Sequence, residues 1–418
     1  MGIATPLSTS GRFIVDANGR RVKLAGVNWI GAHMDDAVVA GLDRVHRDAL
    51  AETIAGLGFN CVRFPFSLRM MQQTTPVPDP LLAANTDLYG STPMRVYDAC
   101  VAALTAAGLI VIPNCHLLDA GWCCSDDDNN GLWYNDRWPA ESFMTAWQDM
   151  ATRYATQPLV AAMDIKNEPR PARVGWRTLI PTWGHRKRTD FAAMYTAVGN
   201  LIHGASPDPL ILCDGLGYAA NLTGVAAHPV RLGQDGKVVY GRHDYPWFHP
   251  GHQPRQAFVN ELTTEAGYIL ADEIAPVWLG EFSTDTRSLA NFGLAPPSQG
   301  NEARNAAWWD NIHGWLTAND VDWCWWGLNG THVRGTNPAT GRLAFGRGNR
   351  ATDGLLTEDW RGAASPAIME ILQSMMPARL GPGYAPERGL AVRRLGGTQR
   401  RSSAWAHASH GAYPRGGA

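Results

Sequence analysis

Residues 160–169 read VAAMDIKNEP, an apolar run that ends in Asn167 and Glu168 and is followed by Pro169. Because proline has no backbone N–H to donate to a neighbouring strand, the pattern predicts a buried strand that stops just after Glu168. Residues 276–282 read PVWLGEF, and they place Glu281 near the end of another apolar run. The two segments therefore predict two strands that each present a carboxylate where the strand ends.

The rest of the chain alternates between strand-like and helix-like segments. Strands are predicted at 24–29, 61–66, 109–116, 160–167, 210–213, 238–245, 276–282 and 322–326, and helices at about 46–57, 93–107, 139–155, 189–206, 256–271, 302–318 and 366–375. Segment 216–237 holds at most a short helix. The alternation implies a parallel sheet, and eight such units close naturally into a single (β/α)₈ TIM barrel of the α/β class. An open doubly wound sheet is the alternative, but the chain lacks the GxGxxG and P-loop motifs of a nucleotide site.

Two terminal regions differ from this pattern. Near the N-terminus, Asn18-Gly19 lies between two apolar stretches and predicts a β-hairpin. Residues 380–418 hold eight glycines and six arginines but one acidic residue. This composition predicts one barrel domain over 1–379 and a Gly/Arg-rich tail over 380–418 that is accessory or weakly structured.

The composition narrows the classes of partner. The 418 residues are 45% apolar and 18% charged, which suits a globular chain with a large core. The formal net charge of −2 argues against nucleic acid and against an anionic membrane surface. No apolar run approaches the roughly 18 residues of a membrane span, and no secretory signal is visible. The 17 tryptophans outnumber the 11 tyrosines, which indicates an aromatic core, flat ligand-stacking surfaces, or both.

The seven cysteines are an odd number, so at least one is unpaired. Five lie in apolar segments and are predicted to be buried: Cys61, Cys100, Cys115, Cys213 and Cys324. Cys123 and Cys124 are adjacent in a polar loop. Neighbouring cysteines rarely bond each other, so the sequence leaves open whether either forms a disulfide. No spacing of cysteine and histidine suggests zinc.

In a (β/α)₈ enzyme the working residues lie at the carboxyl ends of the strands. Glu168 and Glu281 end predicted strands four and seven, which face each other across such a barrel. Two carboxyls about 5 Å apart suit double-displacement cleavage of a glycosidic bond. The predicted strand ends carry Arg63, His116, Asn167, Glu168, His243, Tyr245, Glu281 and Trp326. Each of these residues alone has a structural explanation, but eight at one rim are hard to explain by packing.

These motifs resemble glycoside hydrolase family 5, the cellulase-like retaining barrels, over roughly residues 11–375. The resemblance is carried by Asn167-Glu168-Pro169 and Leu279-Gly280-Glu281-Phe282, with Val62-Arg63-Phe64-Pro65 and Asn114-Cys115-His116 upstream. It implies that Glu168 is the acid/base and Glu281 the nucleophile. It also implies that Asn167 bonds the sugar 2-hydroxyl and that Arg63 supports Glu281.

The resemblance assigns the remaining rim residues as well. His116 would line the −1 subsite, His243 would orient Glu168, and Tyr245 would touch Glu281. Trp326 would form the platform under the −1 sugar, with Trp325 or Trp323 as alternatives. No metal or other cofactor is implied.

The loop 119–136 departs from a minimal barrel, because it is long and acidic. Trp122 and Trp133 are predicted to stack on sugars beyond the cleaved bond, and Tyr134 could do the same. Its run Asp126-Asp127-Asp128 is either a cation site or a solvated turn, and the missing DxDxDG spacing favours the turn.

The predicted activity is that of a retaining endo-β-1,4-glucanase that acts on β-glucan. A β-mannanase, a β-1,3-glucanase or an exo-acting β-glucosidase are alternatives, and the long loop could favour exo action. A non-catalytic sugar-binding barrel, a phosphate-binding isomerase and a metal hydrolase are more distant alternatives. The nearest metal-like cluster is His243-Asp244-Tyr245 with His249 and His252. A polysaccharide substrate leads us to expect a secreted protein, and the sequence does not indicate an oligomeric state.

Overall fold

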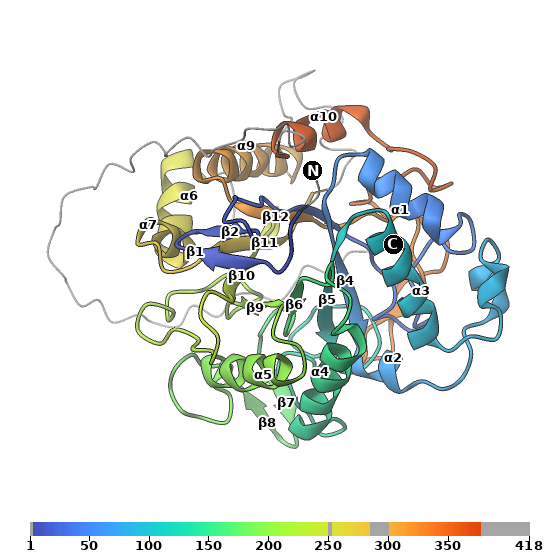
Figure 1. Cartoon of the computed structure of the whole chain (residues 1–418), viewed down its shortest axis with the longest axis horizontal. Helices are drawn as coiled ribbons and strands as arrows, with labels where there is room; N and C mark the ends of the chain where they lie inside the picture. The colour runs from blue at the N-terminus through green and yellow to red at the C-terminus, as the bar shows by residue number, and fades with distance from the viewer. Residues whose placement is uncertain (1–2, 250–252, 285–300, 378–418) are drawn as a thin grey trace, which may run out of the picture. The chain divides into compact units, whose positions relative to one another are not determined.

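Eight parallel strands close into a barrel in the computed structural model, which describes residues 3–249, 253–284 and 301–377 (Figure 1). The strands in order are β3 (Ala25–Asn28), β4 (Cys61–Ser67), β5 (Ile110–Leu117), β6 (Ala162–Asp164), β9 (Leu210–Asp214), β10 (Val238–Asp244), β11 (Val277–Phe282) and β12 (Asp322–Trp325). β12 pairs in parallel with β3 and closes the ring. Each strand overlaps a predicted one, so the predicted TIM barrel is confirmed.

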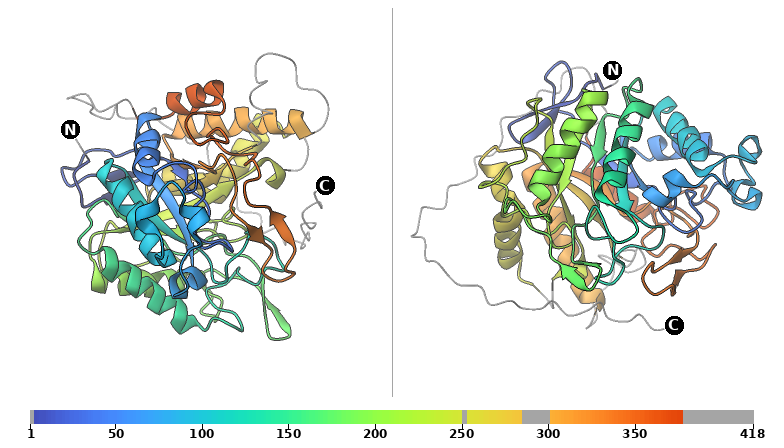
Figure 2. Two further views of the ribbon diagram at one scale, coloured as in Figure 1. Left: turned by 90° about the vertical axis from the view of Figure 1, so that its right-hand side faces the viewer. Right: turned by 90° about the horizontal axis from the view of Figure 1, so that it is seen from below.

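Helices surround the barrel, as Figures 1 and 2 show. They are α1 (Arg47–Gly56), α3 (Pro93–Ala106), α4 (Ala140–Tyr154), α5 (Phe191–Ala205), α6 (Arg255–Leu262), which runs through η4 (Thr263–Gly267) into α7 (Tyr268–Ala271), then α9 (Asn301–Asn319) and α10 (Pro366–Ser374). All seven predicted helical segments are present. The short elements α2 (Leu68–Gln72), η1 (Asp79–Leu82), η2 (Thr86–Leu88) and η3 (Pro246–Phe248) were not predicted, because a few residues carry too little periodicity.

A hairpin of β1 (Ser8–Ser10) and β2 (Phe13–Val15) covers the amino end of the barrel. Leu7 and Ile14, from beside and within it, belong to a buried cluster with residues at or near the beginning of the barrel strands: Cys61, Ile110, Ile112, Ala162, Leu210, Leu212, Val239, Trp278 and Cys324. The predicted turn at Asn18-Gly19 is present, but it closes a single bridge between Val15 and Arg21. The paired strands β1 and β2 lie one turn earlier in the chain. At the predicted turn, the Asp16 carboxylate accepts the N–H groups of Asn18 and Arg20.

Long loops follow the strands at the opposite, carboxyl end. The loop 119–136 follows β5, the hairpin β7 (Ala172–Val174) with β8 (Arg177–Leu179) follows β6, and β13 (Gly335–Thr336) pairs with β14 (Leu343–Phe345) after β12. Gly121 brings the first loop against the third. A Cβ at Gly121, whose φ is +150°, would lie 2.5 Å from the Thr336 carbonyl oxygen, so no larger residue fits. The predicted extended loop after the third barrel strand is thus present, and it packs against the loop that follows β12 at the carboxyl end of the barrel.

The predicted tail at 380–418 lies outside the described residues, and the boundary at 379 stays a prediction. Within the described residues, no helix combines the length and the apolar character needed to cross a membrane.

Candidate active site

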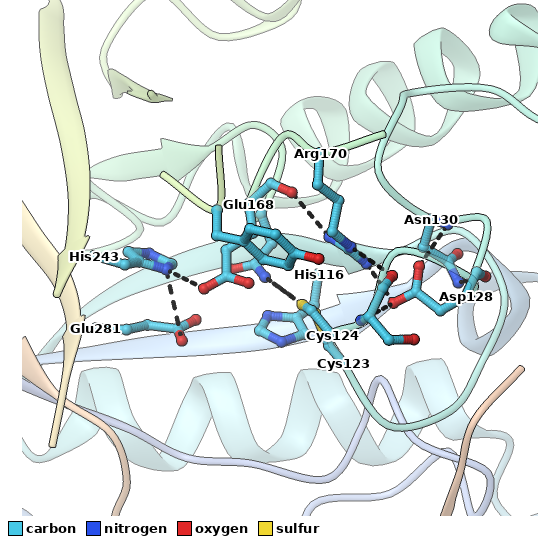
Figure 3. The surroundings of a disulfide bond; sticks show 12 residues. His116, Cys123, Cys124, Asp128, Asn130, Glu168, Arg170, His243 and Glu281 are labelled. Carbon is cyan, nitrogen blue, oxygen red and sulfur yellow. Dashed lines mark hydrogen bonds and ion pairs between the residues drawn. A yellow bond between two sulfur atoms is a disulfide. The ribbon is translucent and has the colours of Figure 1, made fainter. Parts of the chain in front are cut away.

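Glu168 and Glu281 meet at the carboxyl end of the barrel, with His243 between them (Figure 3). Nδ1 of His243 lies 2.9 Å from Oε1 of Glu168 and 3.6 Å from Oε2 of Glu281. Potential ligand atoms of the three side chains all lie within 4.8 Å of one another. Both carboxyls are nearly buried, at 5% and 4% exposure. One oxygen of each carboxylate thus lies within 4.8 Å of the other, which fits the spacing of about 5 Å between the two carboxyls of retaining glycosidases.

The backbone at Glu168 differs from the predicted strand. β6 ends at Asp164, although the N–H groups of Ile165 and Asn167 still donate to the neighbouring strands. Glu168 has a φ of +44°, a left-handed conformation uncommon for a non-glycine residue, and its N–H donates to Oδ2 of Asp214 at 3.2 Å. The turn before Pro169 therefore aims the Glu168 side chain, and the proline is not what ends the strand.

Arg63, from β4, connects Glu281 on β11 with β6 and the segment that follows β6. Its Nη1 donates to Oε1 of Glu281 at 2.5 Å and its Nη2 to Oδ1 of Asn167 at 2.7 Å. Its Nε donates to Oδ2 of Asp164 at 2.6 Å. Burial alone would lower the pKa of this guanidinium, but Asp164, Glu281 and Asp214 together raise the pKa above its ordinary value. Arg63 is thus a permanent positive charge that holds Glu281 and Asn167 in fixed positions.

Tyr245 supplies a further donor to Glu281. Its hydroxyl donates to Oε2 at 2.9 Å. Its ring stacks on Trp247, with centroids 4.4 Å apart and planes at 12°. Glu281 therefore accepts from a guanidinium and a phenol, whereas the Glu168 carboxylate has His243 as its hydrogen-bonding neighbour.

The pKa of both carboxyls is raised, but the groups that oppose the increase differ between them. Burial raises the pKa of Glu168 to about 7, although Arg170 and Arg63 oppose the shift. Burial also raises the pKa of Glu281, but His243, Arg63 and the Tyr245 hydroxyl act against it. Burial lowers the pKa of His243 to about 4, so this imidazole is neutral near pH 7. Two titratable groups with unlike surroundings are the usual source of one proton donor and one ionised carboxylate.

His116 and Trp326 form a second face of the site. Their rings stack in parallel, with centroids 5.3 Å apart and an angle of 7°. Nδ1 of His116 hydrogen-bonds Oδ1 of Asn114 at 2.8 Å. The ring of His33 also contacts His116, with centroids 4.3 Å apart. Trp326 directly follows β12 and is 6% exposed, and Trp323 and Trp325 are fully buried.

The structure adds three residues that were not predicted. Oδ1 of Asn28, on β3, accepts from Nη1 of Arg63 at 3.1 Å. Asp214 ends β9 and accepts the N–H of Glu168, and His33 packs on His116. Asp214 follows an apolar run, so the reasoning that found Glu168 could have found it. His33 lies in a loop after β3, where the sequence carries no such signal.

Trp122 and Trp133 lie outside this cluster. Trp122 packs edge-on against Phe345 of β14, with centroids 4.3 Å apart. Trp133 packs edge-on against Phe191 of α5 at 5.1 Å and against Tyr134. Both are partly buried against the core, so each rim tryptophan has at least a packing role.

The acidic run 126–128 is engaged by protein groups. Asp128 forms a buried ion pair with Arg170 at 2.5 Å, Asp127 accepts from the Ser125 hydroxyl at 2.6 Å, and Asp126 accepts from the Tyr218 hydroxyl. The run is thus a hydrogen-bonded turn, and Asp128 is buried within it.

The segment that the sequence offered as nearest to a metal cluster, though better explained as a strand end and a histidine-containing loop, is also tied to protein groups. Asp244 accepts from Trp308 at 2.6 Å and pairs with His249 at 2.9 Å, which raises the pKa of His249 to about 10 against the effect of burial. A histidine held protonated is a poor metal ligand. His252 lies outside the described residues.

A barrel that carries paired glutamates at its carboxyl end has the architecture of a glycoside hydrolase. The family model for cellulase (glycosyl hydrolase family 5) matches residues 15–332. The chain therefore belongs to glycosyl hydrolase family 5 and is a glycoside hydrolase.

Named relatives agree with this family. A glycosyl hydrolase 5 family protein of Chamaecyparis obtusa is 28% identical, over 96% of this chain and 74% of that protein. An endoglucanase of Paenibacillus polymyxa is 28% identical, over 84% and 82%. The major extracellular endoglucanase of Xanthomonas campestris is 25% identical, over 84% and 67%. A solved endocellulase of Pyrococcus horikoshii in complex with cellotetraose has the same fold, with a TM-score of 0.71 and 22% identity over 90% of this chain and all of that one.

Proposed function

We propose that this glycoside hydrolase is a retaining endo-β-1,4-glucanase. The observation that carries the proposal is the pair Glu168 and Glu281, which share His243 and have unlike donors. The relatives named endoglucanase support the glucan substrate and the endo mode. The stacked pair His116 and Trp326 adds a flat face of the kind on which a sugar ring packs.

Glu281 acts as the nucleophile in this proposal. Held ionised by Arg63 and Tyr245, it attacks the anomeric carbon while protonated Glu168 gives its proton to the departing oxygen. A glycosyl-enzyme forms on Glu281. Glu168, now ionised, takes a proton from water, which attacks the anomeric carbon, releases the sugar with retained configuration and restores the Glu281 carboxylate.

The neighbours of the two glutamates act as positioning groups. The pKa of Glu168, raised to about 7, lets it hold a proton in neutral solution. Neutral His243 bonds it without fixing it as an anion. Asn167 is held by Arg63, and its amide nitrogen is proposed to bind the 2-hydroxyl of the sugar beside Glu281. Trp326 is proposed to lie beneath that sugar.

The test is the product profile from cellopentaose, read together with the anomeric proton signals of the first products. An endo-acting retaining enzyme should release cellobiose and cellotriose, and the reducing end newly formed by cleavage should initially be the β-anomer, in excess over the α/β mixture already present at the reducing end of the substrate. Release of glucose alone would show exo action, and an initial excess of the α-anomer at the new reducing end would show inversion. If the protein cleaves β-mannan or β-1,3-glucan but not cellopentaose, the substrate assignment is wrong and the mechanism stands.

We also propose that the protein acts outside the cell. Polymeric glucan is too large to enter a cell, and the disulfide between Cys123 and Cys124 suits an oxidising compartment. The similar Xanthomonas enzyme is named extracellular. Fractionation of the producing cells tests this proposal, since recovery only in the reducing cytoplasm would contradict it.

A further inference from the structure

Cys123 and Cys124 are bonded to each other beside the paired glutamates (Figure 3). The amide nitrogen Nδ2 of Asn167 contacts both sulfur atoms, at 3.5 Å from Sγ of Cys123 and 3.7 Å from Sγ of Cys124. Asn167 immediately precedes Glu168. The disulfide therefore adjoins the residue pair that would hold the sugar and protonate the leaving group.

The loop that carries the disulfide is fastened to the backbone of Glu168. Arg170 Nε donates to the carbonyl oxygen of Ser125 at 3.3 Å, and its Nη2 pairs with the buried carboxylate of Asp128 at 2.5 Å. Nη1 of the same guanidinium donates to the carbonyl oxygen of Glu168 at 2.8 Å. One buried guanidinium thus connects the loop to the backbone of the acid/base residue. The position of the disulfide relative to Glu168 is therefore fixed.

The disulfide also lies on a defined side of the site. In Figure 3 it is on the side of Glu168 away from Glu281. Cys123 is buried, but Cys124 is partly exposed. In double displacement the leaving group departs from the face opposite the nucleophile, toward the acid/base. In the proposed mechanism, the side of Glu168 on which Cys124 lies is the side toward which the leaving sugar departs.

The chemistry of a disulfide suits this position. Divalent sulfur is polarisable and has no strong hydrogen-bond donor, so it packs well against apolar C–H groups such as those on the face of a sugar ring. The bond between adjacent residues also restricts the loop to a narrow set of shapes, which lowers the entropy lost when a sugar binds.

We propose that the Cys123–Cys124 disulfide forms a binding surface for the leaving-group sugar. This assignment rests on the glycosidase mechanism proposed above and names the part of the chain that contacts the departing side of the substrate. It makes Cys124 a contact residue and Asn167 the link between that surface and Glu168.

The cysteines of this chain allow a clean test. All seven lie within the described residues, and the other five are free and buried. Tris(2-carboxyethyl)phosphine has one disulfide to reduce: two electrons from phosphorus and two protons from solvent give two thiols, and water supplies the oxygen of the phosphine oxide. Free thiols then counted on the folded and on the denatured protein report complete reduction.

The experiment compares two substrates in the oxidised and the reduced protein. Cellopentaose has sugars on the leaving side, whereas β-cellobiosyl fluoride has a single atom there. We expect reduction to raise KM for cellopentaose by roughly three- to tenfold, as for the loss of one good contact, and to change kcat/KM for the fluoride less than about twofold. The double variant Cys123→Ser/Cys124→Ser should show the same changes in KM and kcat/KM, and the phosphine should not alter its kinetics. Cys100→Ala, in the buried face of α3, should respond to the phosphine as the parent protein does.

Two other outcomes overturn the proposal, and a third bears on the substrate assignment. Unchanged kinetics on both substrates would place the disulfide outside the binding surface. An equal loss on both would show that it acts through the placement of Asn167 and Glu168 and does not contact the sugar. An oxidised protein that hydrolyses the fluoride but not cellopentaose refutes the glucanase function alone, and the same comparison is then made with the oligosaccharide that the protein does cleave.

Discussion

The Tyr245 hydroxyl offers the sharpest test of the proposal that Glu281 is ionised. It donates to Oε2 at 2.9 Å, and its replacement in Tyr245→Phe leaves Arg63 as the close donor. A hydrogen bond to a charged group contributes about 1.5–3 kcal/mol, and 1.36 kcal/mol corresponds to one pKa unit. The substitution should therefore raise the pKa of Glu281 by roughly one to two units beyond the increase that burial already causes.

The sign follows from the role proposed for each carboxyl. Glu281 must be ionised to attack, so the acidic limb of kcat/KM should move to higher pH by the same one to two units, roughly. The alkaline limb belongs to Glu168, with a pKa of about 7, and should stay in place. The active pH range then narrows from its acidic side, and maximal kcat/KM falls.

The assay is the pH profile of kcat/KM on β-cellobiosyl fluoride for Tyr245→Phe and the parent protein. Tyr97→Phe is the matched control, since its buried hydroxyl donates at 2.8 Å to the carbonyl oxygen of Phe64. The control should lose some thermal stability, and both limbs of its pH profile should stay at the pH of the parent protein. If the acidic limb of Tyr245→Phe superimposes on that of the parent protein, the hydroxyl does not stabilise the Glu281 carboxylate and the reasoning fails.

Further predictions concern the same site and its support. Glu281→Ala should lower kcat on an aryl cellobioside by roughly four orders of magnitude or more, and near-normal turnover would rule out this nucleophile. Glu168→Ala should slow cellopentaose far more than an activated aryl cellobioside and should remove the alkaline limb near pH 7, whereas equal losses would point to another acid. Asp128→Asn leaves the buried Arg170 without its carboxylate and should destabilise the fold by about 3–5 kcal/mol in thermal unfolding, while Asp127→Asn should stay within about 0.5 kcal/mol. Chelation with EDTA should leave turnover unchanged, and a loss that added metal restores would indicate a bound ion that the enzyme requires.

The sequence predicts the barrel well because its strands are buried on both faces. Every residue of β5 and of β11 is buried, so each strand begins as an apolar run, and its polar residues come toward its carboxyl end: Asn114 and His116 in β5 and Glu281 in β11. A strand end is thus visible as a change of composition. This is how Glu168, Glu281 and His243 were found without any knowledge of which strands pair.

Other parts of the site depend on contacts between distant segments. Asn28 matters because its amide oxygen accepts from Arg63, 35 positions along the chain, and no local pattern reports that contact. His33 acquires its place by packing on His116. Bonds between adjacent cysteines are rare, so the sequence alone left open whether Cys123 and Cys124 form a disulfide. The left-handed turn at Glu168 was missed because Pro169 offered a simpler reason for the strand to end.

Arg63 has a consequence for engineering that extends beyond hydrolysis. In a Glu281→Ala protein the guanidinium and the Tyr245 hydroxyl would still point to the space that the carboxylate occupied. Such a space is a receptor for a small anion, and formate or azide fits its charge and its donors. An exogenous anion seated there could displace a fluoride or a phenol from an activated sugar. A glycosyl fluoride of inverted configuration would instead place its own halogen at those donors. The chain would then join sugars, because it would retain its acid/base but have no carboxylate with which to cleave the product.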